Sequence, residues 1–220
     1  MTTSAQTIAE QVVALNATLA TLAPAEVMAR FVAEQAGLNA AGPPSGATEP
    51  GAPMPDGALL DAHGKPTTLA GARAGRPSVV VFYRGAWCPY CNLALHTYQR
   101  QLLPELTARG VELIALSPQK PDGSLTAVQT GELSFTVLSD PGNQIAGQLG
   151  ILTQPTDGAR ESQRQLGLDL PAANADGTAV IPMPTAVVVD AGGTIRWIDV
   201  HPNYTTRSEP AEILAALATL

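Results

Sequence analysis

Apolar residues recur at helical spacing at the start of the chain. One stripe is typical of a helix; it consists of Ile8, Val12, Leu15, Leu19 and Leu22. Pro24 suits the first position of a second helix, which Gly37 is expected to end. Residues 1–38 are therefore predicted to be a helical extension. We expect it to pack on the rest of the protein, with a role in docking or in a possible homodimer as the alternative.

Proline and glycine interrupt the pattern over residues 39–57, which are predicted to be a semi-rigid linker. The main domain is then predicted to span residues 58–220. Its first segment has two short apolar stretches around the turn-rich residues 61–65, which indicates a hairpin.

Further along, the apolar residues form short runs that are typical of buried strands. Strands are predicted at 78–83, 111–116, 135–138 and 185–189, and a fifth at 194–200. The last two are expected to be antiparallel, because the connection between them is too short for a crossover. Strands that alternate with helices and end in a hairpin indicate an α/β fold, with a mixed sheet covered on both faces.

Capping residues and prolines predict the helices between these strands. Pro104 should kink the helix in which it lies. Asp140 and Pro141 should open a helix that ends near residue 150. The other helices are predicted at 124–132, with Ser124 as the cap, at 161–166 and at 208–217.

Both cysteines of the protein lie in one short stretch, Trp87-Cys88-Pro89-Tyr90-Cys91. A buried strand precedes the stretch, and residues at helical spacing follow it, so Cys88 is predicted at a helix N-terminus. Free N–H groups and the helix dipole should lower the pKa of Cys88 there. Cys91 is expected one turn further in, close enough to form a disulfide. This context favours a dithiol that cycles to a disulfide, with Cys88 as nucleophile and Cys91 as resolving cysteine.

Three alternative roles for the cysteine pair have less support. A static disulfide that closes so small a loop stabilises little. A zinc site would need further ligands, whereas His63, His96 and His201 are scattered along the chain. Two inert core thiols are the third alternative. We therefore expect no metal and no cofactor.

Composition narrows the partners and the compartment. The net charge of −7 and the pI near 4.8 argue against nucleic acid or an anionic membrane as a partner. No apolar run approaches the roughly 20 residues of a membrane span, and we find no signal peptide at the N-terminus. A cytoplasmic protein is expected, and in that compartment a CxxC pair is more often catalytic than structural.

The order of these elements, with WCPYC after the first core strand, resembles the thioredoxin fold. More narrowly, the chain resembles the peroxiredoxin-like branch, the alkyl hydroperoxide reductase/thiol-specific antioxidant family. The resemblance covers roughly residues 58–218. Four segments carry it: residues 82–91, 135–142, 184–190 and 206–212.

The chain departs from that family at two places. Gly85 stands where peroxiredoxins carry a Thr or Ser that positions the peroxide, and Pro184-Thr185 replace an arginine opposite the cysteine. The resemblance to thioredoxin-fold proteins implies a cis bond before Pro184, packed against the cysteine pair. Arg207 matches an arginine of the family, but since its usual partner is absent we expect it to be structural or peripheral.

The resemblance implies a thiol oxidoreductase that reduces peroxides with antioxidant effect. Cys88 would become a sulfenic acid, Cys91 would form a disulfide with it, and a dithiol such as thioredoxin would restore the pair. Trp87 and Tyr90 would shield the site, and backbone N–H groups, helped by Arg84, would stabilise developing charge. The alternatives are that Arg84 is a solvated turn residue and that Trp87 is a core anchor. Because Gly85 lacks the hydroxyl, a slow peroxidase is expected. The alternatives are a protein thiol-disulfide oxidoreductase that uses the same CxxC, and a non-catalytic binding module.

Overall fold

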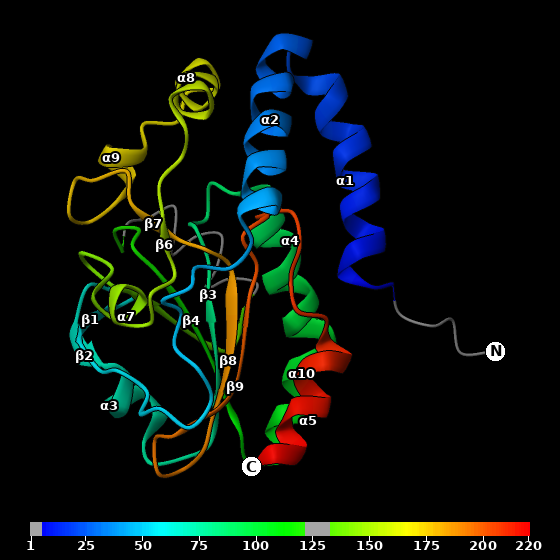
Figure 1. Cartoon of the computed structure of the whole chain (residues 1–220). Helices are drawn as coiled ribbons and strands as arrows, with labels where there is room; N and C mark the ends of the chain where they lie inside the picture. Colours follow the sequence, from blue (N-terminus) through cyan, green and yellow to red (C-terminus); the bar gives the residue numbers. More distant parts are fainter. Residues whose placement is uncertain (1–5, 122–132) are drawn as a thin grey trace.

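A mixed β-sheet forms the centre of the molecule (Figure 1). The computed structural model describes residues 6–121 and 133–220. Within that part, seven strands lie in the order β2-β1-β5-β4-β3-β8-β9. They are β1 (Ala58–Asp61), β2 (Pro66–Thr68), β3 (Ser78–Phe82), β4 (Glu112–Ser117), β5 (Thr136–Ser139), β8 (Thr185–Val189) and β9 (Ile195–Val200). A separate antiparallel pair joins β6 (Leu152–Thr153) to β7 (Ile181–Pro182).

The directions of the strands agree with the predicted mixed sheet. β3, β4 and β5 are parallel to one another, as expected of strands joined by helical crossovers. β8 lies antiparallel to β3 on one side, and β9 lies antiparallel to β8. β1 and β2 form the predicted hairpin and extend the sheet on the other side through β5. The five strands and the hairpin predicted from the apolar runs are thus confirmed.

Helices cover both faces of the sheet, and the alternation of side chains along β3 shows why. Val79 and Val81 belong to the hydrophobic cluster beneath α4 (Pro89–Thr97), α5 (Leu103–Ala108) and α10 (Pro210–Ala216). Val80 and Phe82 belong to the cluster on the opposite face, beneath α3 (Leu69–Arg73) and α7 (Gln144–Gln148). Because successive side chains of a strand point to opposite faces, a strand that is apolar throughout must be buried on both.

The helices of the described residues are α1 (Ile8–Leu22), α2 (Ala25–Ala41), α3 (Leu69–Arg73), α4 (Pro89–Thr97), α5 (Leu103–Ala108), α7 (Gln144–Gln148), α8 (Asp157–Gln165), α9 (Leu170–Ala173) and α10 (Pro210–Ala216). Helices α1 and α2 precede the first strand, α10 follows the last, and the others lie between strands. A π-helical turn (Tyr98–Leu102) joins α4 to α5, and a 3₁₀ turn (Leu217–Thr219) follows α10. The π-helical turn just before Pro104 shows that the regular helix is interrupted where a kink was predicted.

Three predicted helix boundaries were wrong. α8 begins at Asp157 rather than at residue 161. α2 continues past Gly37 to Ala41, and Gly42 ends it with a φ of 69° and an N–H bond to the Leu38 carbonyl. α7 begins after Asn143 rather than at Asp140. The Asp140 carboxylate nevertheless accepts the first N–H groups of that helix, because the intervening turn brings it back beneath them. The helix predicted at 124–132 falls outside the described residues.

The two N-terminal helices pack on the main domain, α1 against α4 and α2 against α8 (Figure 1). The carboxylate of Glu209 accepts the backbone N–H groups of Ile8 and Ala9 at 2.8 and 2.9 Å. This is a favourable place for a negative charge, because the first N–H groups of a helix have no partner within it. The division into extension, linker and domain stays a prediction.

The peptide bond between Met183 and Pro184 is trans, so the predicted cis bond was wrong; the described residues contain no cis peptide bond. Met183 and Pro184 connect β7 directly to β8. The N–H of Met183 donates to the Ile151 carbonyl at 2.8 Å, and the Pro184 carbonyl accepts from His201 at the same distance. These bonds hold an extended path, which a trans peptide satisfies.

Among the described helices, we find none with both the length and the apolar character that a bilayer crossing requires.

Candidate active site

The cysteine pair lies where strand β3 passes into helix α4. Cys88 is the N-cap residue of α4 and Pro89 its first residue, as the sequence predicted. The N–H of Cys88 is donated to the Gly85 carbonyl at 3.1 Å, and its carbonyl accepts from Cys91 at 3.0 Å. The strand, the tight turn and the helix therefore fix both cysteines relative to each other.

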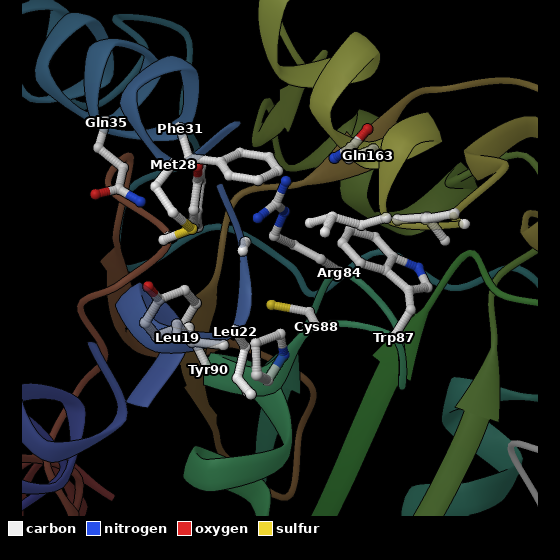
Figure 2. Close-up of a pocket in the computed structure, with 16 residues that line it drawn as sticks. Leu19, Leu22, Met28, Phe31, Gln35, Arg84, Trp87, Cys88, Tyr90 and Gln163 are labelled. Carbon is white, nitrogen blue, oxygen red and sulfur yellow. The ribbon is translucent and has the colours of Figure 1, made fainter. Parts of the chain in front are cut away.

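Both cysteines are free thiols, and both are buried, with 1 % of Cys88 and 0 % of Cys91 exposed. Cys88 nevertheless borders a cavity, and Figure 2 shows its sulfur pointing into that space. Cys91 lies behind it and borders a second, much smaller space beneath the loop that carries Arg207. One sulfur thus faces a place where a ligand can sit, and the other faces protein.

The predicted direction of the Cys88 pKa was wrong. Burial raises the pKa of the Cys88 thiol well above its ordinary value, and the Cys91 sulfur beside it raises it further. Burial also opposes ionisation of Cys91, but hydrogen bonds from Cys88 and the nearby Arg207 lower the pKa of Cys91 to about 5. Since the two sulfurs share a proton, we expect one negative charge on the pair, held mainly at Cys91.

Arg207 is the nearest positive group to this charge. Its Nη2 lies 3.0 Å from the Cys91 sulfur, and its Nη1 donates to the carbonyls of Tyr204 and Thr206 at 2.6 Å each. Arg207, which was predicted to be structural or peripheral, thus lies in direct contact with Cys91, and its role stays a prediction. Because two backbone carbonyls hold Nη1, the planar guanidinium presents Nη2 to the Cys91 sulfur in a fixed direction.

Three side chains form a hydrogen-bonded cluster around the loop that carries Arg207. The Asp199 carboxylate accepts from Ser208 at 2.7 Å and lies 2.8 Å from a ring nitrogen of His201. Hydrogen bonds from His201, and also from Ser208, hold the pKa of Asp199 below its ordinary value. This cluster ties the end of β9 to the start of α10, and so supports Arg207 between them.

Arg84 lies on the other side of the pair, at the end of β3. Only 5 % of it is exposed, and its guanidinium stacks over the ring of Tyr204 at 3.9 Å and that of Trp87 at 5.0 Å. Its Nε has no hydrogen-bond partner among the described residues. A buried cation with an unused donor, beside the cavity that Cys88 faces, is able to bind an oxygen that carries negative charge.

The cavity itself has a volume of about 390 Å³ and is lined mostly by apolar groups. Trp87, Pro89 and Tyr90 of the cysteine stretch form part of its wall. The facing wall comes from α1 and α2, which bring Leu19, Leu22, Met28 and Phe31 over Cys88 (Figure 2). The sequence placed no chemistry on these helices, and it is the tertiary packing that brings them to the site.

The structure explains why residue 85 is a glycine. Its φ is 146°, a conformation that residues with a side chain rarely adopt. A Cβ atom there would clash with Nε1 of Trp87 and lie 2.9 Å from Oε1 of Gln119. The same Gln119 oxygen accepts the N–H of Ala86 at 2.7 Å. The turn thus has no room for the threonine or serine that the family resemblance suggested for this position.

Pro184 and Thr185 lie beside Cys91 rather than Cys88, at the small space that Arg207 also borders. The Thr185 hydroxyl donates to the Met183 carbonyl at 2.9 Å, so it is engaged locally. The structure therefore divides the predicted site residues into two groups. Arg84, Trp87, Pro89 and Tyr90 surround the cavity of Cys88, while Pro184, Thr185 and Arg207 lie around Cys91.

Tyr204, Gln119 and Asn16 also belong to the site, although the sequence did not predict them. Tyr204 carries Arg84 on its ring, Gln119 holds the turn before Cys88, and Asn16 of α1 accepts a hydrogen bond from the Tyr90 hydroxyl at 2.7 Å. No local pattern marks these residues, because each acts across a long separation in sequence. Within the described ranges no three His, Cys, Asp or Glu side chains form a cluster that could hold a metal ion.

Comparison with known proteins gives a family and a fold. The sequence profile of the AhpC/TSA family matches residues 50–198. A candidate peroxiredoxin of Mycobacterium tuberculosis strain H37Rv is 34 % identical over 96 residues, which cover 44 % of this chain and 60 % of that protein. The thiol-disulfide oxidoreductase ResA of Bacillus cereus is 29 % identical over 109 residues, 49 % of this chain and 61 % of that one. The chain thus spans about three fifths of the length of these relatives.

Solved structures agree on the fold. Reduced Prx3 from Vibrio vulnificus superposes with a TM-score of 0.61 at 19 % identity, over 78 % of this chain and 99 % of that one. Peroxidoxin BcpB from Mycobacterium tuberculosis gives a TM-score of 0.56 at 19 % identity, over 78 % of this chain and 96 % of that one. The predicted thioredoxin-like fold of peroxiredoxin type is thereby confirmed. The family match begins at residue 50, after α1 and α2.

Proposed function

This chain belongs to the AhpC/TSA family, and from that premise we propose that it is a peroxiredoxin-like thiol peroxidase with Cys88 as its nucleophile and Cys91 as its resolving cysteine. One observation carries the assignment of roles. The sulfur of Cys88 faces a cavity, while the sulfur of Cys91 is enclosed and lies against Arg207. A substrate can therefore meet Cys88 but not Cys91.

In the first step, the sulfur of Cys88 attacks the terminal oxygen of a hydroperoxide. An S–O bond forms as the O–O bond breaks, and the sulfur gives up two electrons to the peroxide. Cys88 passes its thiol proton to the Cys91 thiolate as it attacks. The departing alkoxide takes a proton from solvent and leaves as an alcohol, or as water when the substrate is hydrogen peroxide. Cys88 is then a sulfenic acid, and Cys91, whose pKa is about 5, loses the proton and is again a thiolate.

In the second step, the Cys91 thiolate attacks the sulfur of Cys88. The S–S bond forms, the S–O bond breaks, and hydroxide takes a proton from solvent and leaves as water. An external dithiol of thioredoxin type then returns two electrons and reduces the disulfide. The low pKa of Cys91 supports this step, because the attacking group must be a thiolate.

Arg84 is proposed to stabilise the negative charge that develops on the departing oxygen. Its guanidinium is buried, its Nε is unpaired among the described residues, and it borders the cavity of Cys88. The N–H of Cys88 is already donated to Gly85, and Pro89 has none, so the start of α4 offers fewer donors than the sequence suggested. Trp87 and Tyr90 are proposed to keep water from the reacting atoms.

A second function, protein thiol-disulfide exchange, is favoured by the ResA relatives and by the thioredoxin-type cysteine stretch. The burial of both sulfurs beneath α1 and α2 speaks against it, since a disulfide in a folded partner would have to reach Cys88 through these helices. A non-catalytic binding module is a third alternative. It is disfavoured because both cysteines and two nearby cations are present.

The Cys91→Ser variant separates these functions. After limited peroxide, a peroxidase should carry one added oxygen on Cys88, detected by mass spectrometry, with over-oxidation at higher dose. Cys88→Ser is the matched control and should consume no peroxide. If Cys88 stays unmodified and the variant instead recovers mixed disulfides from a cell extract, thiol-disulfide exchange replaces the proposal. If neither adduct forms, the proposal is replaced by the non-catalytic binding module.

We also propose that the protein acts in the cytoplasm, where thioredoxin-type reductants keep such a pair reduced. Both of its cysteines belong to the redox pair, so the fold does not depend on a structural disulfide. Fractionation of the source cells with an antibody to the protein would test the compartment.

A further inference from the structure

The cavity that Cys88 faces is much larger than hydrogen peroxide requires. Its volume is about 390 Å³. A water molecule takes roughly 30 Å³ in the liquid, so the cavity could hold roughly ten molecules of that size. Hydrogen peroxide is only slightly larger than water and would leave most of the apolar wall uncovered. The cavity therefore has room for a substrate that carries an organic group beside the peroxide.

The wall opposite Cys88 does not come from the domain that the family shares. Leu19 and Leu22 of α1, together with Met28 and Phe31 of α2, line the cavity, and the family match begins only at residue 50. Figure 2 shows these side chains facing Arg84 and Cys88 across the open space. The two helices are also held in place, because the hydroxyl of Tyr90 donates to Asn16 at 2.7 Å and Ser162 of α8 donates to the Val27 carbonyl at 3.1 Å.

The chemistry of the lining restricts the ligand further. Arg84 is the one charged side chain among the described residues that line the cavity. It lies on the side of Cys88, where the peroxide oxygens must be. The facing side is mostly aliphatic, aromatic and thioether in character; the amides of Gln35 and Gln163 are its polar side-chain groups, and it carries no charge. A ligand that matches these surfaces has one polar end and a neutral apolar body.

We propose that the helix pair α1–α2 determines substrate specificity, and that it favours organic hydroperoxides with a bulky, neutral apolar group over hydrogen peroxide. The apolar group would lie against Met28 and Phe31, and the peroxide group between Arg84 and Cys88. This inference rests on the proposed function and narrows its substrate class. The reaction at Cys88 is unchanged, and the alcohol that leaves carries the apolar group.

Stopped-flow kinetics of the reduced full-length protein would test the proposal, with cumene hydroperoxide as the bulky substrate and hydrogen peroxide as the small one. We expect the second-order rate constant with cumene hydroperoxide to be at least roughly tenfold higher. In Phe31→Ala that rate constant should fall by about tenfold, because the apolar group loses a wall, while the rate with hydrogen peroxide stays within about twofold. Met28→Ala should act in the same direction.

Val32→Ala is the matched control. Val32 follows Phe31 on the same helix, but 59 % of it is exposed and it does not line the cavity. It should change neither rate. A second readout does not need turnover: cumyl alcohol, the product, should change the fluorescence of Trp87, which lines the cavity, in a saturable way. Phe31→Ala should weaken this binding. Circular dichroism of each variant would show that the helices remain folded.

The outcomes separate the two proposals. If neither hydroperoxide oxidises Cys88, the proposed function fails, and the substrate class fails with it. If the protein reacts with hydrogen peroxide as fast as with cumene hydroperoxide, the peroxidase function stands and the inference is overturned. The same conclusion follows if Phe31→Ala slows both substrates equally, because the helices would then support the site without selecting the substrate.

Discussion

The guanidinium of Arg207 lies 3.0 Å from the sulfur of Cys91, the cysteine that faces protein rather than the cavity. This contact places positive charge beside the proposed resolving cysteine. It makes Cys91, and not the N-cap residue Cys88, the sulfur whose pKa is lowered. The dipole of α4 is outweighed here, because Cys88 is buried and is a proton donor to its neighbour.

Replacing Arg207 with methionine should raise the pKa of the thiolate in the reduced protein. From a value of about 5 we expect an increase of roughly one to three pH units, since an adjacent opposite charge is removed. The ultraviolet absorbance of the thiolate, measured against pH, would show it. Arg207→Lys is the control that retains the charge. The pKa of its thiolate should lie between those of the wild type and Arg207→Met. If the thiolate of Arg207→Met titrates as in the wild type, another group stabilises the thiolate.

Arg207→Ala should affect the two chemical steps differently. Oxidation of Cys88 should slow by less than about tenfold, or ~1.4 kcal/mol of barrier, because Arg207 contacts the other cysteine. Disulfide formation should slow more, because Cys91 is then less often a thiolate. Rapid-quench mass spectrometry would follow the sulfenic acid and the disulfide separately. A larger loss in the first step would show that Arg207 also acts on Cys88.

The pH dependence of stability should follow the lowered pKa of Cys91. An unfolded cysteine has an ordinary pKa of 9.0, and the folded value is about 5. Between these values the unfolded chain binds more protons, so the reduced protein should gain stability as pH rises through this range and lose it as pH falls through about 5. The raised pKa of Cys88 acts above this range, where it should lower stability. Urea unfolding of wild type and Cys91→Ser at several pH values would measure the difference.

Gly85→Ala should destabilise the protein. Both the backbone conformation and the contact with Trp87 and Gln119 oppose a side chain, and we expect a loss of about 2–4 kcal/mol in the free energy of unfolding. Gly75→Ala is the control, because Gly75 also has a positive φ but no described atom lies within 4 Å of its added Cβ. It should lose roughly 1 kcal/mol or less. Equal losses in the two variants would mean that the contact with Trp87 is unimportant.

Tyr90→Phe should loosen α1 from the site. It removes the hydrogen bond to Asn16, which we expect to be worth about 0.5–1.5 kcal/mol. Hydrogen exchange should then become faster along α1 and remain unchanged in the central strands. A double-mutant cycle with Asn16→Ala would isolate the pair, since the two changes should not add. Fully additive effects would show that the hydrogen bond contributes nothing.

The positions of the strands and of the cysteine pair were predictable, because they depend on neighbours in sequence. Continuous apolar runs of this length are typical of strands buried on both faces, and β3, β4, β5 and β8 lie where such runs occur. The boundary of α2 was missed because Gly37 lies within the helix, and the next glycine, Gly42, ends it. The trans bond before Pro184 was missed because the hydrogen bonds of β6 and β7 decide the path of the chain there.

The sequence by itself determined that Cys88 caps a helix after a buried strand and that Cys91 follows one turn later, because this arrangement is local. Only the tertiary structure decided which sulfur has the lowered pKa and which groups surround each sulfur. Arg207 comes from a segment 116 residues after Cys91, and the wall of the cavity comes from helices far before Cys88 in the chain. Charge and burial act through space, and for that reason the pKa of each cysteine and the room beside Cys88 depend on packing that no local pattern records.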